Sequence, residues 1–424
     1  MGKRGIFYGV LLLVIVSGLV LVQSINSEAG VKGPCSDCHT MHNSQNGGSV
    51  NEVGGEAIDA QSYLITGADL SSGANPCLGC HKKNDSGGYF QDPQKQQGDE
   101  NTDAPQVNVD PSSGVFASAA GTYYFVTSDQ TEQGEKSCSK GHNVVGMGND
   151  NDNEDPLLGT TPPGGTDECL GGAGKQLTCA GTSGCHGNRT VDDPLAAIKG
   201  GHHSSALNDY QGRYRDGNSV ATSYRMLLGV RGRVAKNWEH VDPASTDDNL
   251  LTLQDLVADN KDVNVYQGSD SKLSGTMTDP GEDHSINSFC GECHGNAGDN
   301  SEKGFHSLQG LKGKGSTSTT EMDSPWKRHP TDMVMKQDDQ YGGYPGIAGK
   351  DYSLEVPVGF PSITRNGGTN ELQKSQRVVL CVSCHRAHGS QYNDALRWDY
   401  TEIKTTSTDG SGCFRCHTNK YAKQ

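Results

Sequence analysis

The sequence is poor in the residues that normally build a protein core. Among the 395 residues that follow Ala29, Leu, Ile, Val and Phe total only 59, or about 15%. A chain with less than about 20% of these residues and a high net charge is expected to be disordered unless something else supplies apolar surface. This shortage excludes an ordinary domain held together by side chains alone, and favours a fold held by covalent and metal cross-links.

Positive charge and long apolar runs are also scarce. Lys and Arg number 35 against 51 Asp and Glu, which gives a formal net charge of −16. An acidic surface argues against nucleic acid and against anionic membranes as partners. Beyond the N-terminus, no apolar stretch approaches the roughly 20 residues that a membrane span requires.

The N-terminus has the pattern of an export signal. Lys3 and Arg4 precede an apolar run from Val10 to Val22, and Ser27-Glu28-Ala29 follows as a small-x-small cleavage sequence. We expect residues 1–29 to be a secretory signal peptide that is cut after Ala29. The alternative is an uncleaved membrane anchor, for which the apolar run is short.

The most informative pattern is Cys-x-x-Cys-His, the attachment sequence of c-type haem. Two cysteines three positions apart can bond both vinyl groups of one porphyrin, and the histidine that follows can ligate its iron. A lone copy could arise by chance or form half of a zinc site, but five copies exclude both explanations. They span residues 35–39, 77–81, 290–294, 381–385 and 413–417.

A sixth attachment site with a longer spacer is predicted at Cys179, Cys185 and His186. The twelve cysteines of the six predicted sites are Cys35, Cys38, Cys77, Cys80, Cys179, Cys185, Cys290, Cys293, Cys381, Cys384, Cys413 and Cys416. The sequence thus predicts six covalently bound haems c with their iron.

Two of the fourteen cysteines, Cys138 and Cys169, remain outside this set. An oxidising compartment could join them in a disulfide. Cys138 to His142 also reads as an attachment sequence without its second cysteine, which leaves a haem held by one thioether open. Cys179 could instead take part in the disulfide, and the sequence does not decide among these arrangements.

Fifteen histidines are available as iron ligands. Six are predicted to be proximal because they follow a cysteine directly: His39, His81, His186, His294, His385 and His417. Nine others remain, more than six haems need. An enzyme that binds substrate at iron needs one open haem face, whereas electron carriers close both faces. The surplus, together with the absence of a Cys-x-x-Cys-Lys site, predicts an electron-transfer protein and not an enzyme, with no catalytic residues.

Six of these nine histidines are predicted to be distal ligands: His42, His142, His203, His306, His329 and His388. His42 and His388 each lie three residues after a proximal histidine, so neither can ligate the iron of that histidine from the opposite side. Each must reach another haem, which links haems in close pairs. His202, His240 and His284 are spare, although His202 and His203 could exchange roles.

The expected fold is that of an irregular multihaem c-type cytochrome. We expect mostly loops, short helices at haem sites, a few short strands and a core stapled by haem. One β-like run is expected at residues 122–127. Residues 30–424 are predicted to form a single hexahaem unit. Haems 1 and 2 lie in residues 30–90, haem 3 near 179–186, haem 4 near 290–294, and haems 5 and 6 in 381–417.

Several segments resemble, in the same order, the outer-surface hexahaem c-type cytochromes of metal-reducing bacteria, which polymerise into extracellular nanowires. The segments are residues 38–44 (CHTMHNS), 134–136 with 141–145, 223–229, 328–330 and 384–390 (CHRAHGS). The resemblance implies haems with two histidine ligands each, arranged in single file, and end-to-end polymerisation. Two departures from the family leave distal ligands open. The third site has the longer spacer and no histidine three residues on, so His202 or His203 must substitute. The fourth site also lacks a nearby partner, and His306 does not come until twelve residues later.

On this resemblance, the expected function is an extracellular electron conduit to metal oxides or other external acceptors. The chain would be exported through the periplasm and receive electrons from outer-membrane or periplasmic cytochromes. The resemblance also implies that His42 ligates the His385 haem of a neighbouring subunit in a head-to-tail filament; ligation within its own chain is the alternative. A monomeric periplasmic or secreted electron shuttle is the second candidate function, and a haem oxidoreductase such as a nitrite reductase is the third.

Overall fold

The structure is a computed structural model of the 424-residue chain. It describes residues 44–45, 48–49, 52–53, 56–57, 77–81, 107–110, 118–127, 137–145, 147, 177–198, 202, 227, 230–231, 250–257, 264–268, 285–294, 329, 331–336, 340–361, 372–404 and 412–419. The predicted signal peptide and the first haem site, with Cys35, Cys38, His39 and His42, lie outside these residues. His203 and His306 lie outside them as well.

Helices in the described part of the chain are short. The α-helices are α3 (Leu78–His81), α4 (Tyr124–Thr127), α5 (Pro194–Ala197), α6 (Leu253–Val257), α7 (Ile286–His294) and α8 (Cys381–Cys384). The 3₁₀ turns are η2 (Ser137–Lys140), η5 (Lys374–Gln376), η6 (Asn393–Ala395), η7 (Tyr400–Glu402) and η8 (Gly412–Arg415). Four of these elements, α3, α7, α8 and η8, carry Cys-x-x-Cys-His sites, as expected from the sequence.

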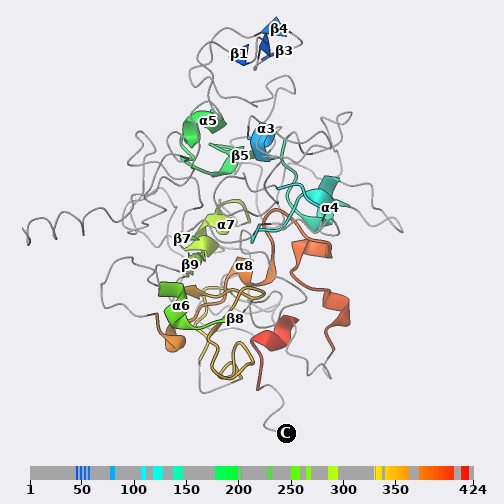
Figure 1. The fold of residues 1–424 in the computed structure, drawn as a ribbon. Coiled ribbons are helices and arrows are strands. Elements are labelled where there is room, and N and C mark those ends of the chain that lie inside the picture. The colour runs from blue at the N-terminus through cyan, green and yellow to red at the C-terminus, as the bar shows by residue number, and fades with distance from the viewer. Residues whose placement is uncertain are drawn as a thin grey trace, which may run out of the picture.

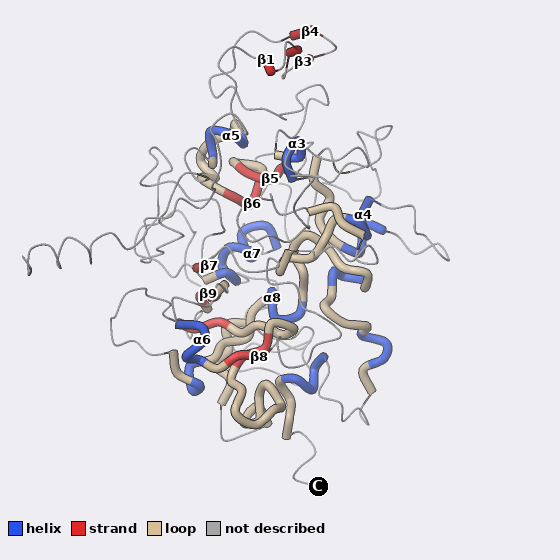
Figure 2. Tube along the Cα trace, viewed as in Figure 1, coloured by secondary structure: helices blue, strands red, loops and turns tan. Residues whose placement is uncertain are grey.

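Strands are two or three residues long and pair only in small groups. The two-stranded pairs are β1 (Ser44–Gln45) with β2 (Gly48–Ser49), β3 (Glu52–Val53) with β4 (Glu56–Ala57), β5 (Thr178–Ala180) with β6 (Gly184–His186), and β8 (Leu250–Leu251) with β10 (Tyr352–Ser353). One sheet has three strands, in the order β11 (Gly359–Phe360), β9 (Val265–Gln267) and β7 (Val230–Arg231). In the described residues, much of the chain between these elements is loop or turn, drawn in tan in Figure 2. The expectation of a loop-rich fold with short helices and few short strands is confirmed.

Side chains do form one sizeable apolar cluster, in the C-terminal half of the chain. It includes the fully buried Tyr352, Phe360 and Leu380. The attachment cysteines Cys185 and Cys290 pack against it. The few aliphatic residues are therefore concentrated where the haem sites converge, so that side chains and haem attachment share one core.

The segment from Thr122 to Thr127 corrects one sequence expectation. It was expected to be β-like, but Tyr124–Thr127 forms helix α4. The side-chain oxygen of Thr122 accepts hydrogen bonds from the backbone N–H groups of Val109 and Tyr124, at 2.9 and 3.1 Å. This local capping closes a turn at the point where a strand would have to continue. Among the residues the structure describes, no helix has the length and apolarity to cross a bilayer.

Candidate haem sites

The attachment sites in the described part of the chain follow one another through the molecule in sequence order. Helix α3 lies nearest the β1–β4 end, strands β5 and β6 come next, then α7 and α8, and the C-terminal end lies opposite (Figure 1). The sequence places Cys-x-x-Cys-His at helix ends because the backbone turn brings the histidine and both cysteines to one side. In α7 and α3 the motif ends the helix at its histidine.

The third site is built differently. Cys179 lies in β5 and Cys185 in β6, and these two strands run parallel with Ala180 opposite His186. Gly181 turns the chain between them with φ of +88°, and its N–H donates to the carbonyl of His186. The five-residue spacer is thus folded into a compact loop that keeps Cys179 close to Cys185. Burial raises the pKa of the Cys185 thiol to about 12, and nearby Cys290, Cys293 and Cys179 contribute in the same direction.

Cysteines of successive sites are close neighbours. Cys185 of the third site lies within electrostatic reach of Cys290 and Cys293 of the fourth. Cys290 also hydrogen-bonds Cys381 of the fifth site and raises the pKa of that thiol. Burial raises the pKa of Cys384 to about 12, with Cys413 of the sixth site as its neighbouring cause. Sites three to six therefore form a continuous series.

Histidine rings meet in four pairs along the same series. The distances between ring centroids are 6.3 Å for His81 and His202, 6.4 Å for His186 and His388, 5.7 Å for His142 and His294, and 6.1 Å for His329 and His417. In the His142–His294 pair the two Nε2 atoms lie 3.4 Å apart. Each pair joins the histidine of an attachment site to one from a distant part of the sequence.

These separations provide a test of whether a haem iron fits between the rings. Imidazole nitrogen binds transition metals such as zinc at about 2.0–2.1 Å. Two imidazoles on opposite sides of one metal therefore have their coordinating nitrogens about 4 Å apart and their ring centres about 6 Å apart. The four observed centroid separations are close to this value. The Nε2 atoms of His142 and His294, at 3.4 Å, lie slightly closer together than two bonds to one metal require, so this pair would have to open a little to hold one.

The structure places the predicted distal ligands as follows. His142, His329 and His388 each lie beside the histidine of an attachment site. At the second site the ring beside His81 belongs to His202, one of the three spare histidines and the possible exchange partner of His203.

Burial keeps several of these imidazoles in the form that binds a metal. Burial, together with neighbouring His186 and His142, lowers the pKa of His388 to about 3. Burial also lowers the pKa of His385, although the carbonyl of Asp394 opposes this effect. Neutral imidazole has a nitrogen lone pair free for iron, so both rings are prepared as ligands.

In four of the ligand candidates the second ring nitrogen, Nδ1, also has a hydrogen-bond partner. The Nδ1 atoms of His142 and His385 face the backbone carbonyls of Ala387 and Asp394, at 2.5 and 2.7 Å. A carbonyl only accepts, so Nδ1 carries the proton and Nε2 is left for the metal.

Two further ring nitrogens face side chains. Nδ1 of His388 lies 3.3 Å from the hydroxyl of Ser118, and Nδ1 of His417 lies 3.1 Å from Oε1 of Gln340. None of these four partners has a recognisable sequence signal. They are the functional residues that sequence reasoning missed.

Close glycine packing positions the segment that carries His388. The backbone of Gly389 bridges to Gly121 and to Gly141. A Cβ on Gly121 would lie 2.0 Å from the carbonyl oxygen of Gly389, so only glycine fits there. The junction joins the chain near His142 to the chain that carries His388. It holds histidines of two neighbouring sites in place through backbone contacts.

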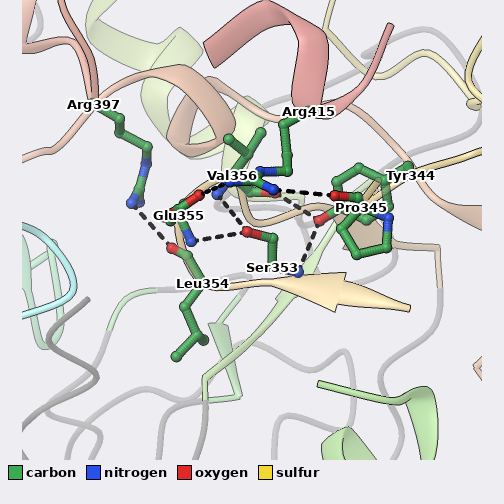
Figure 3. A network of polar contacts seen from close by, with 8 residues as sticks. All are labelled: Tyr344, Pro345, Ser353, Leu354, Glu355, Val356, Arg397 and Arg415. Carbon is green, nitrogen blue, oxygen red and sulfur yellow. Dashed lines mark hydrogen bonds and ion pairs between the residues drawn. The ribbon is translucent and has the colours of Figure 1, made fainter. Parts of the chain in front are cut away.

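Two arginines, one next to the fifth site and one in the sixth, bind the same loop (Figure 3). Nη1 of Arg397, which follows the fifth site, donates to the carbonyl of Leu354 at 3.4 Å. Arg415, inside the sixth attachment sequence, forms an ion pair with Glu355. The loop of residues 353–356 therefore contacts both C-terminal sites.

Buried cations provide a second test of the fit to haem, which carries two carboxylates. Arg386, between His385 and His388, is half-buried and donates from Nη1 to the carbonyl of Ala119 at 3.2 Å. Desolvation lowers its pKa to about 9, so the side chain remains charged near neutral pH. In the described part of the structure, the Nε atoms of Arg377 and Arg415 are buried without a hydrogen-bond partner. Buried cations and donors require acceptors, and porphyrin carboxylates would meet this need.

Two sequence comparisons found similarity to known c-type cytochrome sequences. Residues 374–422 match the family model of a doubled CXXCH motif. The chain is 26% identical over 398 residues to the C-type cytochrome OmcS of Geobacter sulfurreducens, with 91% of this chain and 83% of that protein covered.

Two solved structures from the same organism also match the chain. One is described as the Outer Membrane Cytochrome S filament, with 20% identity, 91% of this chain and 88% of that chain covered, and a TM-score of 0.42. The other is of OmcS nanowires, with 19% identity, the same coverage and a TM-score of 0.39. From its repeated attachment sites, the doubled motif and a sequence similarity that covers nine-tenths of its length, the chain is an OmcS-like multihaem c-type cytochrome.

Proposed function

We propose that this protein carries electrons along a single file of six covalently bound haems, each held between two histidines. The observation that supports this proposal is the series of four imidazole pairs, each with the spacing of two ligands on one metal. When bound, each haem supplies an iron that takes up and releases one electron. The protein itself attaches, orients and encloses these groups.

The histidine pairs favour electron transfer over catalysis at iron. An iron with imidazole on both faces has no position for a substrate. The predicted proximal set is His39, His81, His186, His294, His385 and His417. The distal set proposed here is His42, His142, His202 or His203, His306, His329 and His388. The protein is accordingly an electron carrier and not an enzyme.

The proposed location is outside the cell. Residues 1–29 act as the signal peptide, and residues 30–424 form one hexahaem unit. OmcS, to which the chain is similar, has been solved as filaments. By this similarity the protein assembles head to tail with copies of itself, takes electrons from outer-membrane or periplasmic cytochromes and delivers them to external acceptors. His42 supplies the distal ligand to the His385 haem of the next subunit.

Three measurements on the secreted protein test the proposal. Mass spectrometry is expected to show residues 30–424 with six haems attached, and electron paramagnetic resonance is expected to show only low-spin ferric iron. Negative-stain electron microscopy is expected to show filaments. A uniformly low-spin monomer would favour the soluble shuttle, and one haem equivalent of high-spin iron would favour an oxidoreductase.

A further inference from the structure

The last haem site differs from the two before it in what holds its ligand. At the fourth and fifth sites, the Nδ1 atoms of His142 and His385 face backbone carbonyls. At the sixth, Nδ1 of His417 faces the side-chain amide of Gln340. A backbone carbonyl is present whatever the residue, whereas a side-chain acceptor is set by one amino acid.

Gln340 is held firmly on the chain around His417. Its backbone carbonyl accepts hydrogen bonds from the N–H of Asn419 at 3.0 Å and from the hydroxyl of Thr418 at 3.3 Å. The Thr418 hydroxyl in turn accepts from the N–H of Gly343, also at 3.0 Å. Three hydrogen bonds therefore join residues 340–343 to residues 417–419.

The orientation of the Gln340 amide is fixed as well. Its Nε2 donates to the hydroxyl of Tyr341 at 3.0 Å, which leaves Oε1 directed at Nδ1 of His417, 3.1 Å away. The Tyr341 ring also lies against the His417 ring, with centroids 5.0 Å apart. If Nε2 of His417 binds iron, Nδ1 carries a proton and needs an acceptor, which Oε1 supplies.

An acceptor on Nδ1 makes a ligating imidazole more electron-rich and raises its basicity. An electron-rich ligand stabilises ferric more than ferrous iron, and hydrogen bonding around the ligands is one of the means by which a protein sets a haem's potential. The site also lies near the C-terminal end of the molecule (Figure 1). We propose that Gln340 is a positioning residue that sets the reduction potential of the His417 haem, and hence the driving force for electron transfer at this end of the chain.

This inference rests on the proposed function, because it requires His417 to be an iron ligand. The test is a spectroelectrochemical titration of the haem-loaded full-length protein and two variants. Gln340→Met keeps the length of the side chain but removes the strong acceptor, so one haem component is expected to move to higher potential. Gln340→Glu strengthens the acceptor, so the same component is expected to move to lower potential.

The expected shift is about tenfold in the ratio of oxidised to reduced haem at a fixed potential, or about 59 mV for a one-electron couple. Gln376→Glu is the matched control, because it adds the same charge at an exposed position of η5. The control is expected to leave the component unmoved. The Glu variant also tests the proposal independently if the Met variant does not fold.

Three results would overturn the proposal. Superimposable titrations of the variants and the parent protein, with all haems low-spin, would show that Gln340 does not set the potential of the His417 haem. They would leave the proposed function intact. An equal shift in Gln376→Glu would assign the effect to charge alone. A parent protein with a high-spin sixth haem would contradict the ligand role of His417, and with it both the proposed function and the Gln340 inference.

Discussion

Nδ1 of His142 lies 2.5 Å from the carbonyl oxygen of Ala387, and this contact joins three haem sites through one short segment. Ala387 lies between His385, the histidine of the fifth site, and His388, whose ring faces His186 of the third. His142 faces His294 of the fourth site. Residues 385–388 thus supply one proposed ligand to the fifth site, a second to the third, and an orienting acceptor to the ligand of the fourth.

The first prediction concerns the ligand role of His142. His142→Ala is expected to leave the mass of the haem-loaded protein unchanged apart from the side chain, since cysteines hold the porphyrin. One haem equivalent is expected to become high-spin, because the ring 3.4 Å from Nε2 of His294 is lost. Electron paramagnetic resonance of the oxidised protein provides the measurement. His240→Ala, which removes a predicted spare histidine, is the control and should remain entirely low-spin.

The second prediction tests the glycine junction that holds His142 and His388. In Gly121→Ala, a Cβ would meet the carbonyl oxygen of Gly389 at 2.0 Å on a backbone with φ of +88°. We expect a loss of stability of about 2–5 kcal/mol, the sum of left-handed strain and overpacking. Gly349→Ala separates the two effects. Gly349 has φ of +80° but no neighbour within 4 Å, so only the strain of about 1–2 kcal/mol is expected.

Thermal unfolding, followed by visible circular dichroism of the haem-loaded protein, compares these two variants. Limited proteolysis near residue 121 provides a second readout. Equal midpoints for the two variants would show that the close approach of Gly121 to Gly389 contributes nothing to stability.

The third prediction distinguishes two adjacent histidines. The centroids of the His202 and His81 rings lie 6.3 Å apart, with an angle of 28° between the ring planes. His202→Ala is therefore expected to convert one haem to the high-spin form, whereas His203→Ala is expected to remain low-spin. The two variants control for one another, because each removes one histidine from the same place in the sequence. The opposite result would assign the ligand role to His203, as the sequence analysis first placed it.

Attachment sites can be predicted from the sequence because all of their chemistry is local. Cysteines and histidine within five residues, or within eight at the third site, define such a site regardless of the surrounding fold. Distal ligands are a tertiary property: His142 and His294 are 152 residues apart in sequence. His142 is far in sequence from the fourth site. The only signals for it in the sequence are the resemblance to a known family and the surplus of histidines.

Features carried by the backbone could not be predicted in the same way. The acceptors opposite His142 and His385 are carbonyls, which every residue possesses. The run at residues 122–127 was wrongly expected to be β-like, because β-branched and aromatic residues outweighed the capping hydroxyl of Thr122. The apolar cluster around Tyr352 and Phe360 was also unexpected, since a low overall aliphatic content conceals a local concentration.

The last prediction concerns His42, which lies outside the described residues. His42 follows His39 by three residues and cannot bind the same iron from the opposite side. It also lies thirteen residues after the predicted cleavage point, near one end of the mature chain. A ligand at an end can bind a haem in the next copy, and contacts that do not close on themselves produce open filaments.

We expect His42→Ala to retain all its haems, to show one high-spin haem equivalent and to remain unassembled in negative-stain images. The His240→Ala control should polymerise normally. Filaments of ordinary length from His42→Ala would show that this ligand does not join the subunits, and would leave ligation within one chain as its role.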